Sequence, residues 1–188
     1  MPRARVNVIP TSAPDDVSGL LKLVETGEID PSRLVAILGK TEGNGCVNDF
    51  TRGFAVSALK HALGANAADI ALVMSGGTEG GLAPHMVTFE VLDENGMGPS
   101  MALGATITSD LRPADIGTLT QVECVAEAVR TAVQSAWIAK NDDVHFVQVK
   151  CPLLTSDRIA SSANGTITKD TLKSMGLSRG ASALGVAL

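Results

Sequence analysis

Apolar residues at the start of the chain follow a strand, helix, strand order. Residues 5–20 begin as a strand, pass through a turn that contains proline and aspartate, and reach a short apolar helix start. Residues 20–25 continue with apolar side chains at helical spacing, and the apolar run 34–40 ends in Lys40. The pattern predicts two strands joined by a helix, with a lysine at the end of the second strand.

The same order of elements recurs in the second half of the chain. Residues 104–119 align with residues 5–20, residues 122–133 have helical apolar spacing, and the run 144–150 ends in Lys150. Each copy then reaches a hydroxyl residue, an arginine and a glycine at the expected start of an alanine-rich helix. The sequence therefore predicts an α/β fold of repeated units, with residues 1–98 as the first unit and 99–188 as an incomplete second unit. The boundary falls in the stretch 93–100, which is rich in glycine, proline and asparagine.

The first copy continues further than the second. Residues 69–74 form an apolar strand that opens into a glycine-rich turn and exposes Ser75. At the same spacing, the serine of the second copy would fall near residue ~202, which is beyond Leu188. We therefore expect the second unit to be cut short.

A serine and two lysines at strand ends are the candidate catalytic residues. A serine hydroxyl becomes a nucleophile when a base takes its proton, and a lysine can be that base. Lys40, Lys150 and Ser75 each follow an apolar strand, where α/β proteins present ligand-binding groups. A lysine at a strand end is ordinarily a solvated surface charge. Its recurrence in both copies favours a functional site.

Two arginines and a glycine pair are the candidate substrate-binding groups. Arg52 and Arg179 are expected at or next to helix starts, where the helix dipole does not favour a cation, so a carbonyl or oxyanion ligand would explain them. The backbone N–H groups of Gly76 and Gly77 are candidate oxyanion donors beside Ser75. The simpler alternative is a tight turn that only needs glycine.

Composition excludes several other classes of protein. The formal net charge of −5 and the 3% aromatic content argue against a nucleic-acid ligand. No apolar run is long enough to span a membrane, and three separate cysteines suggest free thiols and a cytoplasmic location. The histidines His61, His85 and His145 lack metal-ligand spacing, so we expect no metal here and assign them to the hydrogen-bonded scaffold.

Four stretches carry a resemblance to a known family. They are residues 36–53, which include KTEGNGCVNDFTRG, residues 73–80 (VMSGGTEG), residues 145–155 (HFVQVKCPLLT) and residues 174–188. All four resemble the cyanuric acid hydrolase and barbiturase family of ring-opening cyclic amidohydrolases. The resemblance covers essentially the whole chain.

The resemblance implies three units around a flat cyclic imide, each with one serine, one lysine and one arginine. The nucleophile would be the serine of the second unit, with Lys150 as its activating base. Lys40 would be the equivalent lysine of the first unit. Ser75, Gly76, Arg52 and Arg179 would bind the substrate.

The expected activity is hydrolytic opening of cyanuric acid to carboxybiuret and biuret. A barbiturase and a truncated, non-catalytic imide-binding protein are the alternatives. The chain has about half the length usual in the family, so a homo-oligomer or a complementary chain would supply the missing units. No cofactor is expected, since the structural cation that the resemblance implies would lie in the third unit.

Overall fold

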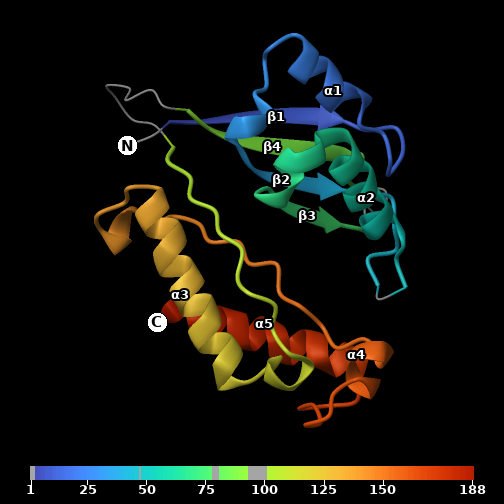
Figure 1. Ribbon diagram of the computed structural model, residues 1–188, viewed down its shortest axis with the longest axis vertical. Coiled ribbons are helices and arrows are strands. Elements are labelled where there is room, and N and C mark those ends of the chain that lie inside the picture. The colour runs from blue at the N-terminus through green and yellow to red at the C-terminus, as the bar shows by residue number, and fades with distance from the viewer. Residues whose placement is uncertain (1–2, 47, 78–80, 93–100) are drawn as a thin grey trace. The chain divides into compact units, whose positions relative to one another are not determined.

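The computed structural model describes residues 3–46, 48–77, 81–92 and 101–188. The chain forms two compact units, Met1–Ala105 and Thr106–Leu188 (Figure 1). The boundary predicted between residues 98 and 99 lies outside the described residues.

A four-stranded sheet forms the first unit. Its strands β1 (Arg3–Pro10), β2 (Leu34–Lys40), β3 (Ala71–Ser75) and β4 (His85–Leu92) lie in the order β1-β4-β2-β3. Strand β4 is antiparallel to both β1 and β2, whereas β2 and β3 are parallel. The parallel pair requires a crossover connection, and helix α2 (Thr51–Leu63) provides it. The α/β class, the strand predicted at the start of residues 5–20 and the strand predicted at residues 34–40 are confirmed.

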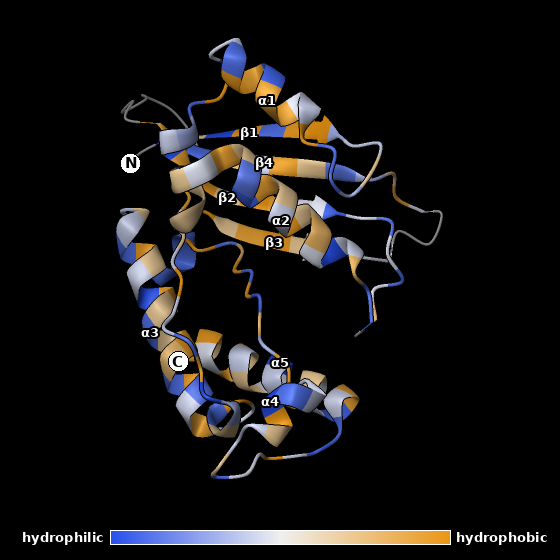
Figure 2. Ribbon diagram, turned by 45° about the vertical axis from the view of Figure 1, so that its right-hand side comes forward, coloured by the Kyte–Doolittle hydropathy of each residue, from blue (hydrophilic) through white to orange (hydrophobic). Residues whose placement is uncertain are grey.

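The core of the first unit joins one face of the sheet to α2 and to helix α1 (Ser18–Glu25). Leu20 of α1 and Leu59 of α2 are buried in one cluster with Ile37 of β2. Short 3-10 turns, η1 (Pro31–Arg33) and η2 (Gly64–Ala68), precede β2 and β3. Figure 2 shows the apolar character of β3, the predicted apolar strand, which lies at one edge of the sheet.

Strand register places three polar side chains together at one end of this sheet. Lys40 of β2 lies opposite Ser75 of β3 in the parallel ladder and opposite His85 of β4 in the antiparallel ladder. Residues in register on neighbouring strands point to the same face. The side chains of Lys40, Ser75 and His85 therefore share one face, opposite the one that Ile37 and Met86 bury.

The second unit is built from helices. Its long helices α3 (Leu119–Ser135) and α5 (Thr171–Ala187) pack together, and α4 (Ser156–Ala160) and the turns η3 (Pro113–Asp115) and η4 (Asn141–Asp143) complete the described elements. The helix predicted at residues 122–133 is confirmed by α3. Gly185 permits the close packing, because a Cβ there would lie 2.5 Å from the Val122 carbonyl oxygen.

A buried glutamine fixes the register of α5 against α3. Gln121 donates from Nε2 to the Ser178 carbonyl, to Ser178 Oγ and to Ser182 Oγ at 2.9–3.1 Å. Its Oε1 accepts the N–H of Gly117 at 2.7 Å. Gln121 and Ser178 are fully buried, so each polar atom depends on these partners.

The strands predicted at the start of residues 104–119 and at residues 144–150 are wrong, since none of the described residues 101–188 lies in a strand. The topology of the first unit supplies the reason. There β1 and β2 do not pair with each other, and β4 lies between them. None of the described residues of the second unit forms a strand that would take the place of β4. A strand forms only where the hydrogen bonds of a neighbouring strand complete its ladder.

The prediction that Arg179 lies at a helix start is also wrong. Helix α5 begins eight residues earlier at Thr171, where Asp170 caps it by accepting the Lys173 N–H at 3.1 Å. The helix then continues through Gly176 and Gly180. Packing against α3 offsets the helix penalty of these glycines, which amounts to about 1 kcal/mol each.

No helix in the described part of the chain is long and apolar enough to cross a membrane.

Replacing Gln121 with leucine should destabilise the second unit by about 1–3 kcal/mol, because the buried hydroxyls of Ser178 and Ser182 would lose their partner. Urea unfolding followed by circular dichroism measures the change. Gln134→Leu, at an exposed position of the same helix, is the matched control and should have little effect. Equal stability of the two variants would contradict the role of Gln121.

Candidate active site

Lys40 and Ser75 lie together at the ends of the two parallel strands. Nζ of Lys40 is 3.4 Å from Ser75 Oγ and donates hydrogen bonds to the carbonyls of Gly76 at 2.8 Å and Gly77 at 3.2 Å. Ser75 is exposed and Lys40 is partly buried. The strand-end position predicted for both residues thus places an accessible hydroxyl beside an amine.

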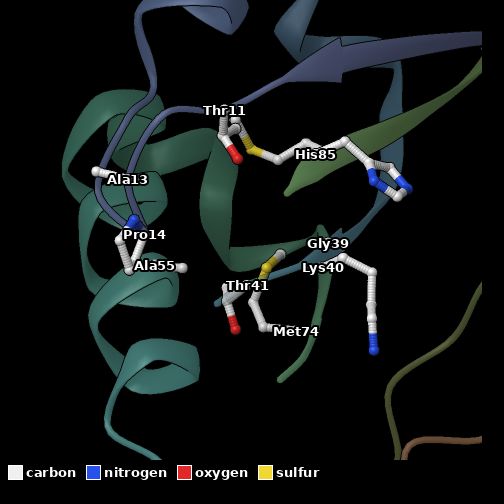
Figure 3. Close-up of a pocket in the computed structure, with 10 residues that line it drawn as sticks. Thr11, Ala13, Pro14, Gly39, Lys40, Thr41, Ala55, Met74 and His85 are labelled. Carbon is white, nitrogen blue, oxygen red and sulfur yellow. The ribbon is translucent and has the colours of Figure 1, made fainter. Parts of the chain in front are cut away.

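His85 lies next to this pair, although the sequence assigned it only a scaffold role. The close-up in Figure 3 shows Lys40 and His85 directed to the same side, away from Ala13, Pro14 and Ala55. Nδ1 of His85 is 2.7 Å from the Ala83 carbonyl, which orients the ring. No sequence motif marks His85, because its place beside Lys40 depends on the β2–β4 register.

Arg52 is the second residue of α2, as predicted, and its guanidinium is held by the loop that precedes the helix. The group donates to the Cys46 carbonyl, and its Nε lies 3.7 Å from Asp49 Oδ2. Asp49 offsets the unfavourable position of a cation at a helix N-terminus. The loop before α2 therefore determines the direction of the Arg52 side chain.

Asp49 has a buried side chain in this site, and the sequence did not indicate its role. Its side chain is only 1% exposed, and it accepts hydrogen bonds from the Gly45 N–H at 2.9 Å, the Thr51 N–H at 2.9 Å and Thr51 Oγ1 at 2.5 Å. An aspartate shortly before a helix start is a common capping signal, which could have indicated the bond to Thr51. The contact with Gly45 and the burial could not be read from that signal.

Two glycines make room for the Asp49 carboxylate. A Cβ at Gly43 would lie 2.0 Å from its oxygens, and a Cβ at Gly76 would lie 1.8 Å from Oδ2. Any larger residue at these positions would have to displace the carboxylate. Gly43 precedes Asp49 in the loop after β2, whereas Gly76 follows β3, so the carboxylate lies between the two segments.

The N–H of Gly77 is not available as an oxyanion donor, which corrects one prediction. It donates to the Gly43 carbonyl at 2.5 Å, while the Gly77 carbonyl accepts from Lys40. Through this bond, the loop after β2 and the turn after β3 stay hydrogen-bonded to each other beyond the ends of the two strands. The substrate-binding role of Gly76 stays a prediction.

The candidate residues of the second unit are solvent-accessible. Lys150 is exposed in an extended segment, which is anchored four residues later where the Leu154 N–H donates to Ser174 Oγ of α5 at 3.0 Å. Arg179 is exposed on α5, directly after the buried Ser178. The catalytic role of Lys150 and the binding role of Arg179 stay predictions. Within the described ranges, no group of three histidine, cysteine, aspartate or glutamate residues is placed to hold a metal ion.

The charge of Asp49 makes the stability of the loop before α2 depend on pH. Burial raises the pKa of this carboxyl, but the hydrogen bonds from Thr51 and Gly45 and the charge of Arg52 more than compensate and hold the pKa below its usual 3.8. A carboxylate whose pKa is lowered by folding stabilises the folded state at pH values above the pKa that it has in the unfolded chain. This contribution is lost as the pH falls through the lower, folded value.

We expect Asp49→Asn to lower the thermal unfolding midpoint at neutral pH, with the difference from the unmodified chain shrinking below about pH 3.8. Unfolding curves recorded between about pH 7 and pH 2.5 measure this difference. The control is Asp142→Asn at an exposed position of the second unit, which should leave the midpoint unchanged. A difference that stayed constant over the whole pH range would contradict the assignment.

Comparison with known proteins identifies relatives of this chain. Residues 5–188 match the family model described as amidohydrolase ring-opening protein. Cyanuric acid amidohydrolase from Azorhizobium caulinodans is 55% identical over 100% of this chain and 55% of its own length. The enzyme of the same name from Ectopseudomonas oleovorans is 52% identical over 98% of this chain and 55% of its own length.

Solved structures agree with these relatives. The crystal structure of cyanuric acid hydrolase from A. caulinodans superimposes with a TM-score of 0.94 at 55% identity, covering 100% of this chain and 55% of that one. A second cyanuric acid hydrolase, described as an evolutionary innovation by structural concatenation, has a TM-score of 0.92 at 46% identity, with 100% and 56% covered. This chain therefore spans about half the length of the relatives that it matches, and it belongs to the ring-opening amidohydrolase family that contains the cyanuric acid amidohydrolases.

Proposed function

We propose that this chain takes part in the hydrolytic ring opening of cyanuric acid. The observation that carries the proposal is the contact of Lys40 Nζ with Ser75 Oγ, in a chain that is 55% identical to a named cyanuric acid amidohydrolase. The reaction needs a nucleophile, a base and donors for a carbonyl oxygen. Among the candidate residues, the lysines are the proposed base and oxyanion-stabilising groups, and the arginines are the proposed donors for carbonyl oxygens. Ser75 adds a hydroxyl group.

The proposed reaction is acyl transfer to a serine followed by hydrolysis. A serine Oγ loses its proton to a lysine and forms a bond to a ring carbonyl carbon, and the adjacent ring C–N bond breaks as the nitrogen takes up a proton. Water then attacks the acyl-enzyme and releases a ring-opened carboxylate. The product is carboxybiuret, which loses carbon dioxide to give biuret.

The contacts of Lys40 favour an electrostatic role for this lysine. Its Nζ faces the carbonyl oxygens of Gly76 and Gly77, which accept hydrogen bonds and have no proton to give. A cation held in this way stabilises a developing oxyanion. We therefore propose that Lys40 stabilises charge beside Ser75, which binds substrate together with Gly76. Lys150 is the proposed base for the nucleophilic serine.

The two arginines would hold carbonyl oxygens of the substrate. Cyanuric acid has three like carbonyls, which suit like donors from successive units, and Arg52 and Arg179 are the proposed donors here. Because the chain spans about half the length of its relatives, we propose that a second copy or a complementary chain supplies the remaining groups. The cytoplasmic location and the homo-oligomer stay predictions, and barbituric acid is the alternative substrate.

Titration calorimetry of the 188-residue chain with cyanuric acid, paired with an assay for biuret release, tests the proposal. Binding with release supports the hydrolase, whereas binding without release supports an imide-binding protein. Barbituric acid, titrated in parallel, reports the preference between the two rings. Absence of both binding and release for either compound would refute the proposal.

In an assembly that turns over cyanuric acid, Lys150→Ala should lower kcat by about 10²–10⁴, the range typical of a general base. Lys140→Ala is the matched control, because it removes another exposed lysine of the same unit. Near-normal ring opening by the Lys150 variant would refute its role as the base.

A further inference from the structure

Asp49 differs from the other aspartates that bond to nearby backbone N–H groups. Asp30 accepts from the N–H and Oγ of Ser32 while its side chain is 49% exposed. Asp16 makes similar bonds to Ser12 and Ser18 on the surface. The side chain of Asp49 is 1% exposed, and each of its two oxygens accepts a hydrogen bond from the protein instead of from water. A carboxylate that only capped α2 would need a hydrogen bond to one oxygen.

The two oxygens of Asp49 join two segments of the loop before α2. Oδ1 accepts from both donors of Thr51 at the start of the helix, and Oδ2 accepts the Gly45 N–H from the middle of the loop. Thr51 Oγ1 lies 2.8 Å from Thr41 Oγ1, directly after β2. Hydrogen bonds through this one carboxylate and Thr51 thus connect the start, the middle and the end of the loop.

The same carboxylate contacts the turn that follows Ser75. It lies between Gly43 and Gly76, with no space for a Cβ on either residue. The Gly77 N–H bonds to the Gly43 carbonyl at 2.5 Å, and the Thr41 N–H bonds to the Ser75 carbonyl at 2.9 Å. Displacement of Asp49 would therefore be transmitted to the backbone beside the Ser75 hydroxyl.

Arg52 is held by this loop as well. Its guanidinium donates to Cys46, the residue after Gly45, and pairs with Asp49 across 3.7 Å. Three hydrogen-bond donors and one cation converge on Asp49, a set that matches a carboxylate. An asparagine of the same shape would direct an N–H toward another donor.

We propose that Asp49 is a positioning residue that holds Arg52 and the Ser75–Gly77 turn in one fixed arrangement. The purpose of that arrangement, the binding of a cyclic imide, rests on the proposed function. Groups that bind a rigid ligand lose little affinity to reorganisation when their geometry is set in advance.

Hydrogen exchange tests the mechanical part of this proposal without any ligand. Asp49→Asn in the 188-residue chain should raise the exchange rates of the Gly45 and Gly77 amides by about tenfold or more, as expected for loss of hydrogen bonds to a charged group. Asp30→Asn is the matched control, because it removes similar bonds at an exposed aspartate, and it should leave these two amides unchanged. Unchanged exchange at Gly77 in the Asp49 variant would overturn the proposal.

A second variant covers the case in which Asp49→Asn does not fold. Gly43→Ala introduces a Cβ that would lie 2.0 Å from the carboxylate, and it should accelerate exchange at the same two amides. Gly53→Ala is its control, because a Cβ there meets no atom within 4 Å. Equal exchange in these two glycine variants would also overturn the proposal.

Calorimetry with cyanuric acid tests whether Asp49 acts through Arg52. We expect Asp49→Asn to weaken binding about tenfold, and we expect the double variant with Arg52→Ala to lose less than the two single losses combined, because the part of the Asp49 effect that acts through Arg52 is already absent. Additive losses would show that Asp49 does not act through Arg52. If the unmodified chain bound no imide, the proposed function would fail, while the exchange rates would still decide whether Asp49 holds the loop.

Discussion

The parallel pairing of β2 with β3 is the interaction on which the first unit depends. It places Lys40 opposite Ser75, and it brings the loop after β2 and the turn after β3 to the same edge of the sheet. Because parallel strands need a crossover, helix α2 must begin near that edge, which places Arg52 in its first turn. The amine, the hydroxyl and the guanidinium are thus positioned by a single feature of the topology.

A buried carboxylate adds a second constraint at this edge. Asp49 accepts hydrogen bonds from Gly45 and Thr51, and its charge offsets that of Arg52 at a helix N-terminus. Burying a charge is costly unless its partners replace the lost water. The set of partners around Asp49 meets that condition, and it also explains why glycines stand at positions 43 and 76. The glycines of this loop and turn therefore make room for a side chain as well as permitting a bend.

The second unit shows how strongly a strand depends on its neighbour. Its helices α3 and α5 are joined through Gln121 and the buried serines of α5 without any sheet. In the first unit, by contrast, β1 and β2 are held in one sheet only because β4 lies between them. The apolar run that ends in Lys150 resembles β2 in sequence, but none of its residues lies in a strand.

The sequence by itself determined the α/β class, the strand that ends at Lys40, the helix that carries Arg52 and the exposed Ser75, because each follows from local periodicity or turn chemistry. Its long motifs also indicated the family. Only the tertiary structure decided that Asp49 is buried under Gly76, that the Gly77 N–H is taken by Gly43, and that Arg179 lies in the middle of α5. These features depend on partners that lie far apart in the chain, and local patterns do not contain that information.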